Sequence, residues 1–306
     1  MKPRFLLVYG LLIFASLSWA GSFVAVRVIH QEIPPIMLGF LRFVVATPVM
    51  FFLLFLLKKP FFLSKQKIPQ LLVLALTGVT LLYMLQFTGV SLTSASTGGV
   101  LINTNVLFIS LFSALFLHER FTRLKTMGVI ISFIGVVFVM FGQMSNEQIV
   151  FDPSFLFGSI LVILSAVCWA VYSIVGKHML KEEDSLVVNA NAFLLGTMLF
   201  LPFVYTDINL VIVNMSVSGL LAVLYLGLFC SVFAYIAWYY ALSKSEAAES
   251  AVFLNFIPLF TILLSFFIGE YPTPLFLVGA GLIILGVVLV QKAKQQLRQM
   301  KIRENI

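Results

Sequence analysis

The sequence predicts an all-α integral membrane protein of ten transmembrane helices, arranged as two inverted five-helix repeats. The composition is the first of three observations behind this prediction. Of the 306 residues, 61% are hydrophobic and 10% are charged, whereas soluble domains are about half apolar and about a quarter charged. The other two observations are an internal duplication and the distribution of Lys and Arg along the chain. Together they exclude a soluble globular protein.

The duplication is clearest where residues 116–139 reappear, without a gap, at 267–290. Pairs that match between the two copies are Glu119 and Glu270, Gly128 and Gly279, Gly135 and Gly286, Tyr83 and Tyr235, Asn103 and Asn255, Trp19 and Trp169, and Arg27 and Lys177. Repeat units of about 150 residues are far longer than those of solenoids. They indicate two halves of one fold, which is typical of secondary transporters. We assign residues 1–146 to the first five-helix repeat and 147–306 to the second.

Ten apolar runs supply the predicted spans, because a helix needs about 20 mostly apolar residues to cross the hydrocarbon layer. The runs are 5–29, 36–57, 68–87, 95–117, 125–141, 155–176, 186–205, 217–241, 251–268 and 275–290. Five runs fall in each half. Because five is odd, the second copy enters the membrane from the opposite side, so the two repeats are predicted to be inverted.

Lys and Arg predict the orientation, because short loops rich in these residues stay in the cytoplasm. With the N-terminus inside, 17 of the 19 Lys and Arg residues fall in inner segments, and the outer loops hold none. The other two, Arg27 and Arg42, lie within or at the ends of spans. We therefore expect a multi-pass protein of the cell (plasma) membrane with both termini cytoplasmic. The net charge of +7 then indicates that the protein contacts the lipid bilayer and does not bind nucleic acid.

The acidic residues and histidines all lie at span ends or in loops. We therefore expect no metal site, no catalytic cluster, no bound cofactor and no enzymatic activity. Proton-coupled carriers usually keep an ionisable group inside a span. The absence of such a group favours a facilitator or exchanger, although coupling through Glu246 or Glu249, at the mouth of the ninth span, stays open.

A stripe of small and polar residues follows one face of the fourth span. Its members are Ser96, Gly99, Asn103 and Ser110. Such a stripe either lines a wet cavity or packs helices together, and the match of Asn103 with Asn255 favours the cavity. Asn105 lies about 200° round the helix from Asn103, so we expect it on another face.

Aromatic residues inside the spans are further candidates for binding a substrate. They are Trp19, Tyr83, Trp169, Tyr235 and Trp238, with Gln86 one turn from Tyr83. Tyr and Trp also anchor helices at the membrane interface, which is the alternative for Trp238 in particular. Trp19 and Trp169 lie in the middle of spans, where a cavity is the better explanation.

Arg42 is the strong charge that lies well inside a span, and an arginine in that position is a functional candidate. It would bind an anionic group of a substrate, or extend to the outer surface and pair with Glu32. Arg27, at a span end, is expected to extend to the surface. Glu119 has basic neighbours in the sequence, whereas Glu270 has none.

Two glycines on each of the fifth and tenth spans, Gly128 with Gly135 and Gly279 with Gly286, are seven residues apart. This spacing predicts close helix packing, either between these two spans or across a homodimer.

These features resemble the EamA-like branch of the drug/metabolite transporter superfamily. The resemblance rests on a Trp-Ala pair in the first helix of each half, Arg42 in the second span, and the motifs at 116–120 (FLHER) and 266–270 (FFIGE), each followed by a GxxxxxxGVV helix. It implies a central cavity built from spans one to four and six to nine, with five and ten set aside. The family often has a proline in the fourth span, but here Val106 is aligned with Pro258.

The leading functional hypothesis is a transporter, an exporter or exchanger of small metabolites such as amino acids, which works by alternating access around a midplane cavity. Substrate contacts are assigned to Trp19, Arg42, Tyr83, Asn103, Trp169, Tyr235, Trp238 and Asn255. The alternatives are an integral membrane enzyme acting on lipid and a passive channel. Neither the catalytic cluster of the first nor the charged ring of the second is evident in the sequence.

Overall fold

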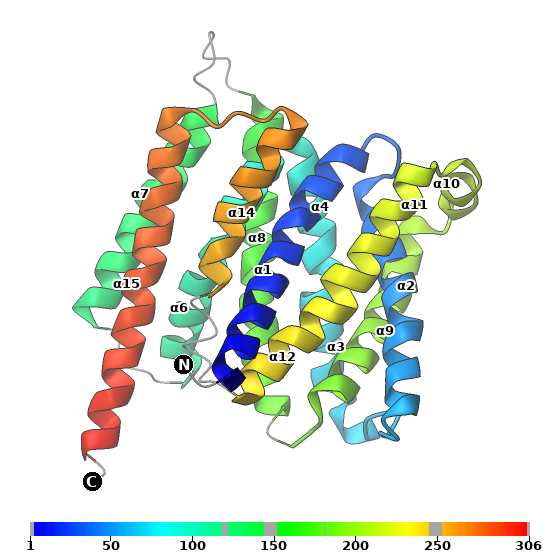
Figure 1. The fold of residues 1–306 in the computed structure, drawn as a ribbon, viewed down its shortest axis with the longest axis horizontal. Coiled ribbons are helices and arrows are strands. Elements are labelled where there is room, and N and C mark those ends of the chain that lie inside the picture. Colours follow the sequence, from blue (N-terminus) through cyan, green and yellow to red (C-terminus); the bar gives the residue numbers. More distant parts are fainter. Residues whose placement is uncertain (1–2, 118–121, 144–151, 181, 245–252, 305–306) are drawn as a thin grey trace.

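The computed structural model describes residues 3–117, 122–143, 152–180, 182–244 and 253–304, and all regular secondary structure among them is helical (Figure 1). This confirms the predicted all-α class. The helices of the first half are α1 (Pro3–Ile29), α2 (Pro35–Leu56), α3 (Ile68–Ala75), α4 (Leu81–Leu92), α5 (Ala95–Leu101), α6 (Asn105–Leu117) and α7 (Arg123–Gln143). Those of the second half are α8 (Pro153–Met179), α9 (Ser185–Val204), α10 (Ile208–Asn214), α11 (Val217–Leu224), α12 (Ala234–Lys244), α14 (Phe256–Ser265) and α15 (Pro274–Glu304).

Seven helical stretches in the described part of the chain are long and apolar enough to cross a membrane. They are Leu7–Ile29, Pro35–Leu56, Lys65–Leu92, Pro153–Met179, Ser185–Val204, Val217–Trp238 and Pro274–Ala293. Two shorter apolar stretches, Ala95–Ile109 and Phe253–Ile268, and α7 lie where the other three spans are predicted. The protein is therefore a multi-pass membrane protein, while the count of ten stays a prediction.

Several spans are not continuous α-helices. Two contain π-helical segments, η2 (Leu76–Thr80) and η4 (Tyr225–Phe233). Two others contain 3₁₀ turns at matching places, η3 (Ile102–Thr104) and η5 (Phe253–Asn255). Proline explains only the second turn, because Pro258 has no N–H to continue the α-helical bonds. Irregular backbone inside a membrane is tolerated where it is buried in protein or lines a cavity.

The first helix of each half packs among helices of the other half. α1 contacts α11, α12 and α14, and we call these four helices the α1 group. α8 contacts α4, α5 and α6, and these four form the α8 group. The two groups also contact each other, since α4 and α5 touch α1 and α5 packs against α14. α2 packs against α9, and α7 packs against α15 at the other side of the molecule (Figure 1).

The α7–α15 contact depends on the four predicted glycines. A Cβ atom at Gly128 would lie 2.5 Å from the carbonyl oxygen of Gly286, and one at Gly135 would lie 2.7 Å from that of Gly279. The sequence left open whether these glycines pack the two helices or a dimer, and the structure shows that they pack the two helices.

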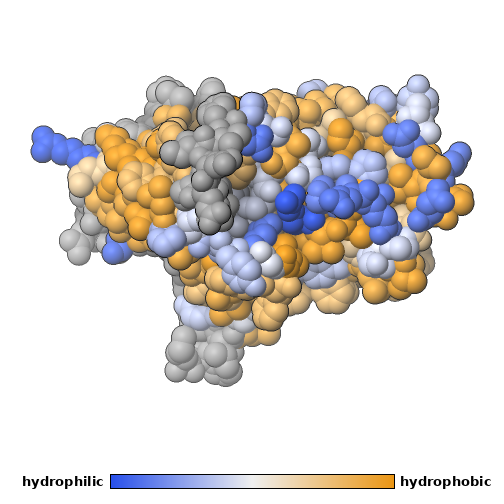
Figure 2. All heavy atoms as spheres, turned by 90° about the horizontal axis from the view of Figure 1, so that it is seen from above, coloured by the Kyte–Doolittle hydropathy of each residue, from blue (hydrophilic) through white to orange (hydrophobic). Residues whose placement is uncertain are grey.

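Apolar side chains cover much of the outer surface of the helices, including Phe52, Phe133 and Phe203, each more than half exposed. Figure 2 looks onto the end of the molecule opposite the two termini. Hydrophilic residues gather in a band across the middle of this face, with hydrophobic residues at the rim. This distribution suits a bundle whose sides face lipid and whose end faces water.

Gly135→Ala should lower the melting temperature of the detergent-solubilised protein by a few degrees, because overpacking at a close contact costs about 1–3 kcal/mol. Gly281→Ala is the matched control on α15, since nothing lies within 4 Å of a Cβ added at that glycine. An equal effect of both substitutions on the melting temperature would mean that the glycine contact does not stabilise the α7–α15 pair.

Candidate functional site

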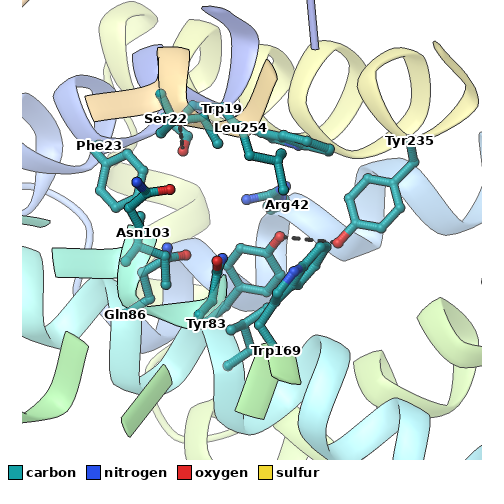
Figure 3. Close-up of a pocket in the computed structure, with 14 residues that line it drawn as sticks. Trp19, Ser22, Phe23, Arg42, Tyr83, Gln86, Asn103, Trp169, Tyr235 and Leu254 are labelled. Atoms are coloured by element: carbon teal, nitrogen blue, oxygen red, sulfur yellow. Dashed lines mark hydrogen bonds between the residues drawn. The ribbon is translucent and has the colours of Figure 1, made fainter. Parts of the chain in front are cut away.

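A cavity lies between the α1 group and the α8 group (Figure 3). Its volume is about 60 Å³, counted as the space that the centre of a water-sized sphere can reach. Its walls are formed by Trp19, Ser22, Phe23, Arg42, Leu82, Tyr83, Gln86, Ile102, Asn103, Asn105, Trp169, Tyr235, Leu254 and Ile257. On this measure a single water occupies about 10–15 Å³, so the cavity accommodates a small molecule.

Arg42 reaches this cavity from α2 and is almost completely buried, with 1% of its surface exposed. Its Nε donates a hydrogen bond to Ser231 Oγ, and its Nη2 donates one to the carbonyl oxygen of Cys230 at 3.1 Å. Both acceptors belong to the π-helix η4. The guanidinium carbon lies 4.1 Å from the centre of the Tyr83 ring. These contacts fix the guanidinium without neutralising its charge.

Within the described part of the chain, no carboxylate lies within 4.0 Å of Arg42. The suggested pairing of Arg42 with Glu32 is therefore wrong. Glu32 accepts hydrogen bonds from the backbone N and Oγ of Ser216 instead, both at 2.7 Å. Figure 3 shows the Arg42 guanidinium pointing into the same space as the side-chain amides of Asn103 and Gln86. Arg42 thus places an uncompensated positive charge at the cavity.

Four aromatic rings surround the cavity on the side of Arg42. The Trp19 ring lies 6.4 Å from Trp169 and 5.8 Å from Tyr235, measured between ring centroids, and contacts both edge-on. The hydroxyls of Tyr83 and Tyr235 are 3.3 Å apart. Trp19 Nε1 donates to the carbonyl oxygen of Cys230 at 3.0 Å, so the same oxygen orients both Trp19 and Arg42. The π faces suit apolar or cationic groups of a ligand.

Amide side chains form another wall of the cavity. Asn103 Nδ2 donates to Asn255 Oδ1 at 3.3 Å, and Asn255 Nδ2 donates to Gln291 Oε1 at 3.2 Å. Asn105 is 7% exposed, and its Oδ1 is a buried acceptor with no hydrogen-bond partner in the described part of the chain. Leaving such an acceptor unmatched costs about 1–3 kcal/mol. A ligand that carries an N–H or O–H donor would satisfy it.

Six of the eight predicted site residues line this cavity, namely Trp19, Arg42, Tyr83, Asn103, Trp169 and Tyr235. The other two lie behind the wall. Trp238 packs on Trp19, with ring centroids 5.7 Å apart, and Asn255 holds Asn103.

Asn105 also lines the cavity, although regular helix geometry predicted another face for it. The 3₁₀ turn η3 comes directly before Asn105, so a rotation of 100° per residue does not apply there. The remaining wall residues that carry no sequence signal are Ser22, Phe23, Leu82, Ile102, Leu254 and Ile257. Serine and apolar residues are too common in spans to be singled out.

The small stripe on the fourth span divides between cavity lining and packing. Asn103 faces the cavity, but Ser96 bonds to Glu270, and Gly99 packs against Thr261. The side chain of Ser110 lies outside the described part of the structure, as do Glu119, Glu246 and Glu249.

The chain is similar in sequence to known proteins over most of its length. The family model described as the EamA-like transporter family matches the chain twice, over residues 6–141 and 156–291. A relative from Archaeoglobus fulgidus, named an uncharacterized transporter, is 36% identical over 288 residues, which cover 93% of this chain and 97% of that protein. Uncharacterized transporter YoaV of Bacillus subtilis is 24% identical over 91% of this chain and 94% of its own length.

A third relative, from Streptantibioticus cattleyicolor, is named a probable terminal-alkyne amino-acid exporter. It is 28% identical over 287 residues, which cover 92% of each protein. One solved structure shares 20% sequence identity, with a TM-score of 0.65 over 96% of this chain and 98% of that one. At this identity it supports the fold alone. The family and these relatives show that the protein is a transporter and not an enzyme. The chain belongs to the EamA-like transporter family.

Proposed function

We propose that this transporter moves a small metabolite with a carboxylate and a donor group, such as an amino acid, out of the cell or in exchange for another. The observation that carries this proposal is the buried guanidinium of Arg42, which faces the cavity and has no carboxylate within 4.0 Å among the residues that the structure describes. A buried charge is costly unless it is paired. A substrate carboxylate would supply the missing charge and accept hydrogen bonds from Arg42 Nη1, which has no partner among the described residues.

The rest of the cavity suits the other parts of such a substrate. Asn105 Oδ1 would accept a hydrogen bond from an ammonium group, and the faces of Trp19 and Trp169 would pack on a side chain. The amino-acid exporter from Streptantibioticus cattleyicolor, similar over 92% of this chain, supports the same substrate class.

Alternating access is the proposed mechanism, because the cavity lies between two groups of helices that can move relative to each other. Residues that match in the two halves face each other in the structure. Tyr83 bonds with Tyr235, Asn103 bonds with Asn255, and Thr47 Oγ1 lies 3.3 Å from Thr197 Oγ1. Such pairs are expected along a pseudo-twofold axis. They support two inverted five-helix repeats, residues 1–146 and 147–306. The distribution of Lys and Arg supports the proposed orientation, with both termini at the cytoplasmic face of the plasma membrane.

Arg42→Gln should weaken amino-acid binding by about 10- to 100-fold, because a hydrogen bond to a charged group contributes about 1.5–3 kcal/mol. Calorimetric titration of the purified protein with a panel of amino acids and the matching amines would measure this change. The amines, which lack the carboxylate, should bind the original and the variant protein equally weakly. Arg123→Gln is the control, since Arg123, at the start of α7, is exposed and does not line the cavity. Unchanged affinity in Arg42→Gln would show that Arg42 does not bind a carboxylate of the substrate.

Asn105→Ala should separate binding from stability. Deleting an unmatched buried acceptor should leave the melting temperature unchanged or slightly raised, whereas affinity should fall about tenfold if the oxygen accepts a donor of the substrate. A fall in melting temperature with unchanged affinity would instead assign Asn105 a structural role.

Transport by proteoliposomes should equilibrate labelled amino acids and ignore an imposed proton gradient, since no carboxylate lines the described cavity. Uptake and release with and without the gradient would test this. Accumulation against the amino-acid gradient would reveal coupling, and Glu246 and Glu249 would be the first residues to replace.

A further inference from the structure

The end of the molecule opposite the termini carries a contact whose purpose the cavity does not explain. Glu270 follows α14 and lies 3.4 Å from Arg27, measured between Oε1 and Nε. Its Oε1 also accepts a hydrogen bond from the backbone N–H of Ala95 at 3.0 Å. Its Oε2 accepts from the backbone N–H and the Oγ of Ser96, at 3.1 and 3.2 Å. Glu270 has no basic neighbour in the sequence, but the fold brings Arg27 to it.

Arg27 makes a second bond in the same cluster. Its Nη1 donates to the carbonyl oxygen of Ser91, near the end of α4, at 2.9 Å. Arg27 is thus held between a carboxylate and a helix-end carbonyl and does not simply extend to the surface as predicted. The side chain of Glu270 is 16% exposed and that of Arg27 is 34% exposed. Partial burial of this kind strengthens charge-assisted bonds relative to those in open water.

Apart from the Arg27–Glu270 ion pair, each of these bonds joins the two helix groups. Arg27 belongs to α1, and Glu270 ends the segment of α14, so both belong to the α1 group. Their partners Ser91, Ala95 and Ser96 belong to α4 and α5 of the α8 group. The Glu270 carboxylate is also stabilised by the N-terminus of α5, where unpaired backbone N–H groups carry partial positive charge.

Close packing reinforces the same contact one turn deeper. A Cβ atom at Gly99 of α5 would lie 2.5 Å from the Cβ of Thr261 of α14, and Thr261 is fully buried. Below this level lie Ile102 and Asn103, which line the cavity. The cluster and the glycine contact therefore lie between the cavity and this end of the molecule.

We infer that Glu270 latches the α1 group to the α8 group, so that it closes the cavity toward the end opposite the termini and releases when that end opens. Since alternating access requires the cavity to open at each face in turn, these bonds have to break in every transport cycle. The inference rests on the proposed mechanism for its role in transport, but access to the cavity can be measured without any substrate.

A second carboxylate provides a matched control. Glu32 also accepts bonds from the N-terminus of a helix, here Ser216 before α11, at the same end of the molecule. Glu32 directly follows α1, and α1 and α11 belong to one group. Its replacement removes a similar interaction within a group and leaves the contact between the groups intact.

The test is the rate at which a membrane-impermeant quaternary-ammonium thiol reagent modifies Ser22→Cys, a reporter in the cavity wall. Cys168 is replaced by Ala, and the same protein without the reporter corrects for reaction at the buried Cys230. The reagent is applied separately to intact cells and to inside-out membrane vesicles. One of these preparations presents the Glu270 face to the reagent and so establishes the orientation.

Glu270→Gln should raise the rate of modification from the Glu270 face about tenfold, because the loss of one charge-assisted hydrogen bond shifts an equilibrium by at least this factor. Gly99→Ala should also raise it, since the added methyl group forces Thr261 away. Glu32→Gln should leave the rate unchanged, as should Gly10→Ala, where an added Cβ meets nothing within 4 Å.

Equal rates in the parent and Glu270→Gln, with both proteins monodisperse, would overturn the latch. An equal increase in Glu32→Gln would overturn it too, because the effect would then be a general loosening of this end. A rise in Gly99→Ala alone would assign closure to packing and not to the carboxylate. None of these outcomes depends on which metabolite is carried, so the latch and the proposed substrate succeed or fail separately.

Discussion

Water does not reach the hydrocarbon layer, so every polar group inside this bundle needs a partner within the protein. Arg42 shows the consequence most clearly. Its charge is held by a carbonyl and a hydroxyl of η4 and by the ring of Tyr83. The Cys230 carbonyl, which lies in the π-helical segment η4, accepts hydrogen bonds from both Trp19 and Arg42. An irregular backbone segment thus becomes the support of the cavity.

The same requirement explains where the helices are interrupted. The turns η3 and η5 contain Asn103 and Asn255, which bond to each other next to the cavity. Glu270 supplies acceptors to the N–H groups at the start of α5. Irregular backbone and unpaired helix ends therefore gather at the boundary between the α1 group and the α8 group. This boundary combines polar bonds with the close packing of Gly99 on Thr261, whereas close contacts of four glycines run along the α7–α15 pair. Polar bonds near the face of the membrane can be replaced by bonds to water when the boundary opens, and continuous close packing favours a rigid pair.

Much of this could be read from the sequence. Composition and the repeat predicted the membrane class, and the motifs of each half carried the resemblance to the family. Six residues that line the cavity were chosen from their types and positions in spans. Membrane helices can be recognised from hydrophobicity alone. The matched pair Tyr83 and Tyr235 pointed to two residues whose hydroxyls meet in the structure. A lone arginine in a span is also informative, because an arginine is stable inside the hydrocarbon layer only when other groups of the protein bind it.

Other features depended on contacts between residues far apart in the chain. The sequence could not show that Arg27 and Glu270 meet, because 243 positions separate them and neither has an acidic or basic neighbour that suggests the pairing. It placed Asn105 on the wrong face, because a 3₁₀ turn changes the rotation between neighbouring residues. By itself the sequence determined the class, the family and the polar residues that a membrane protein would not carry without a purpose. The tertiary structure decided which of them share a cavity and which hold the two helix groups together, because those relations are set by the packing of helices and not by their order.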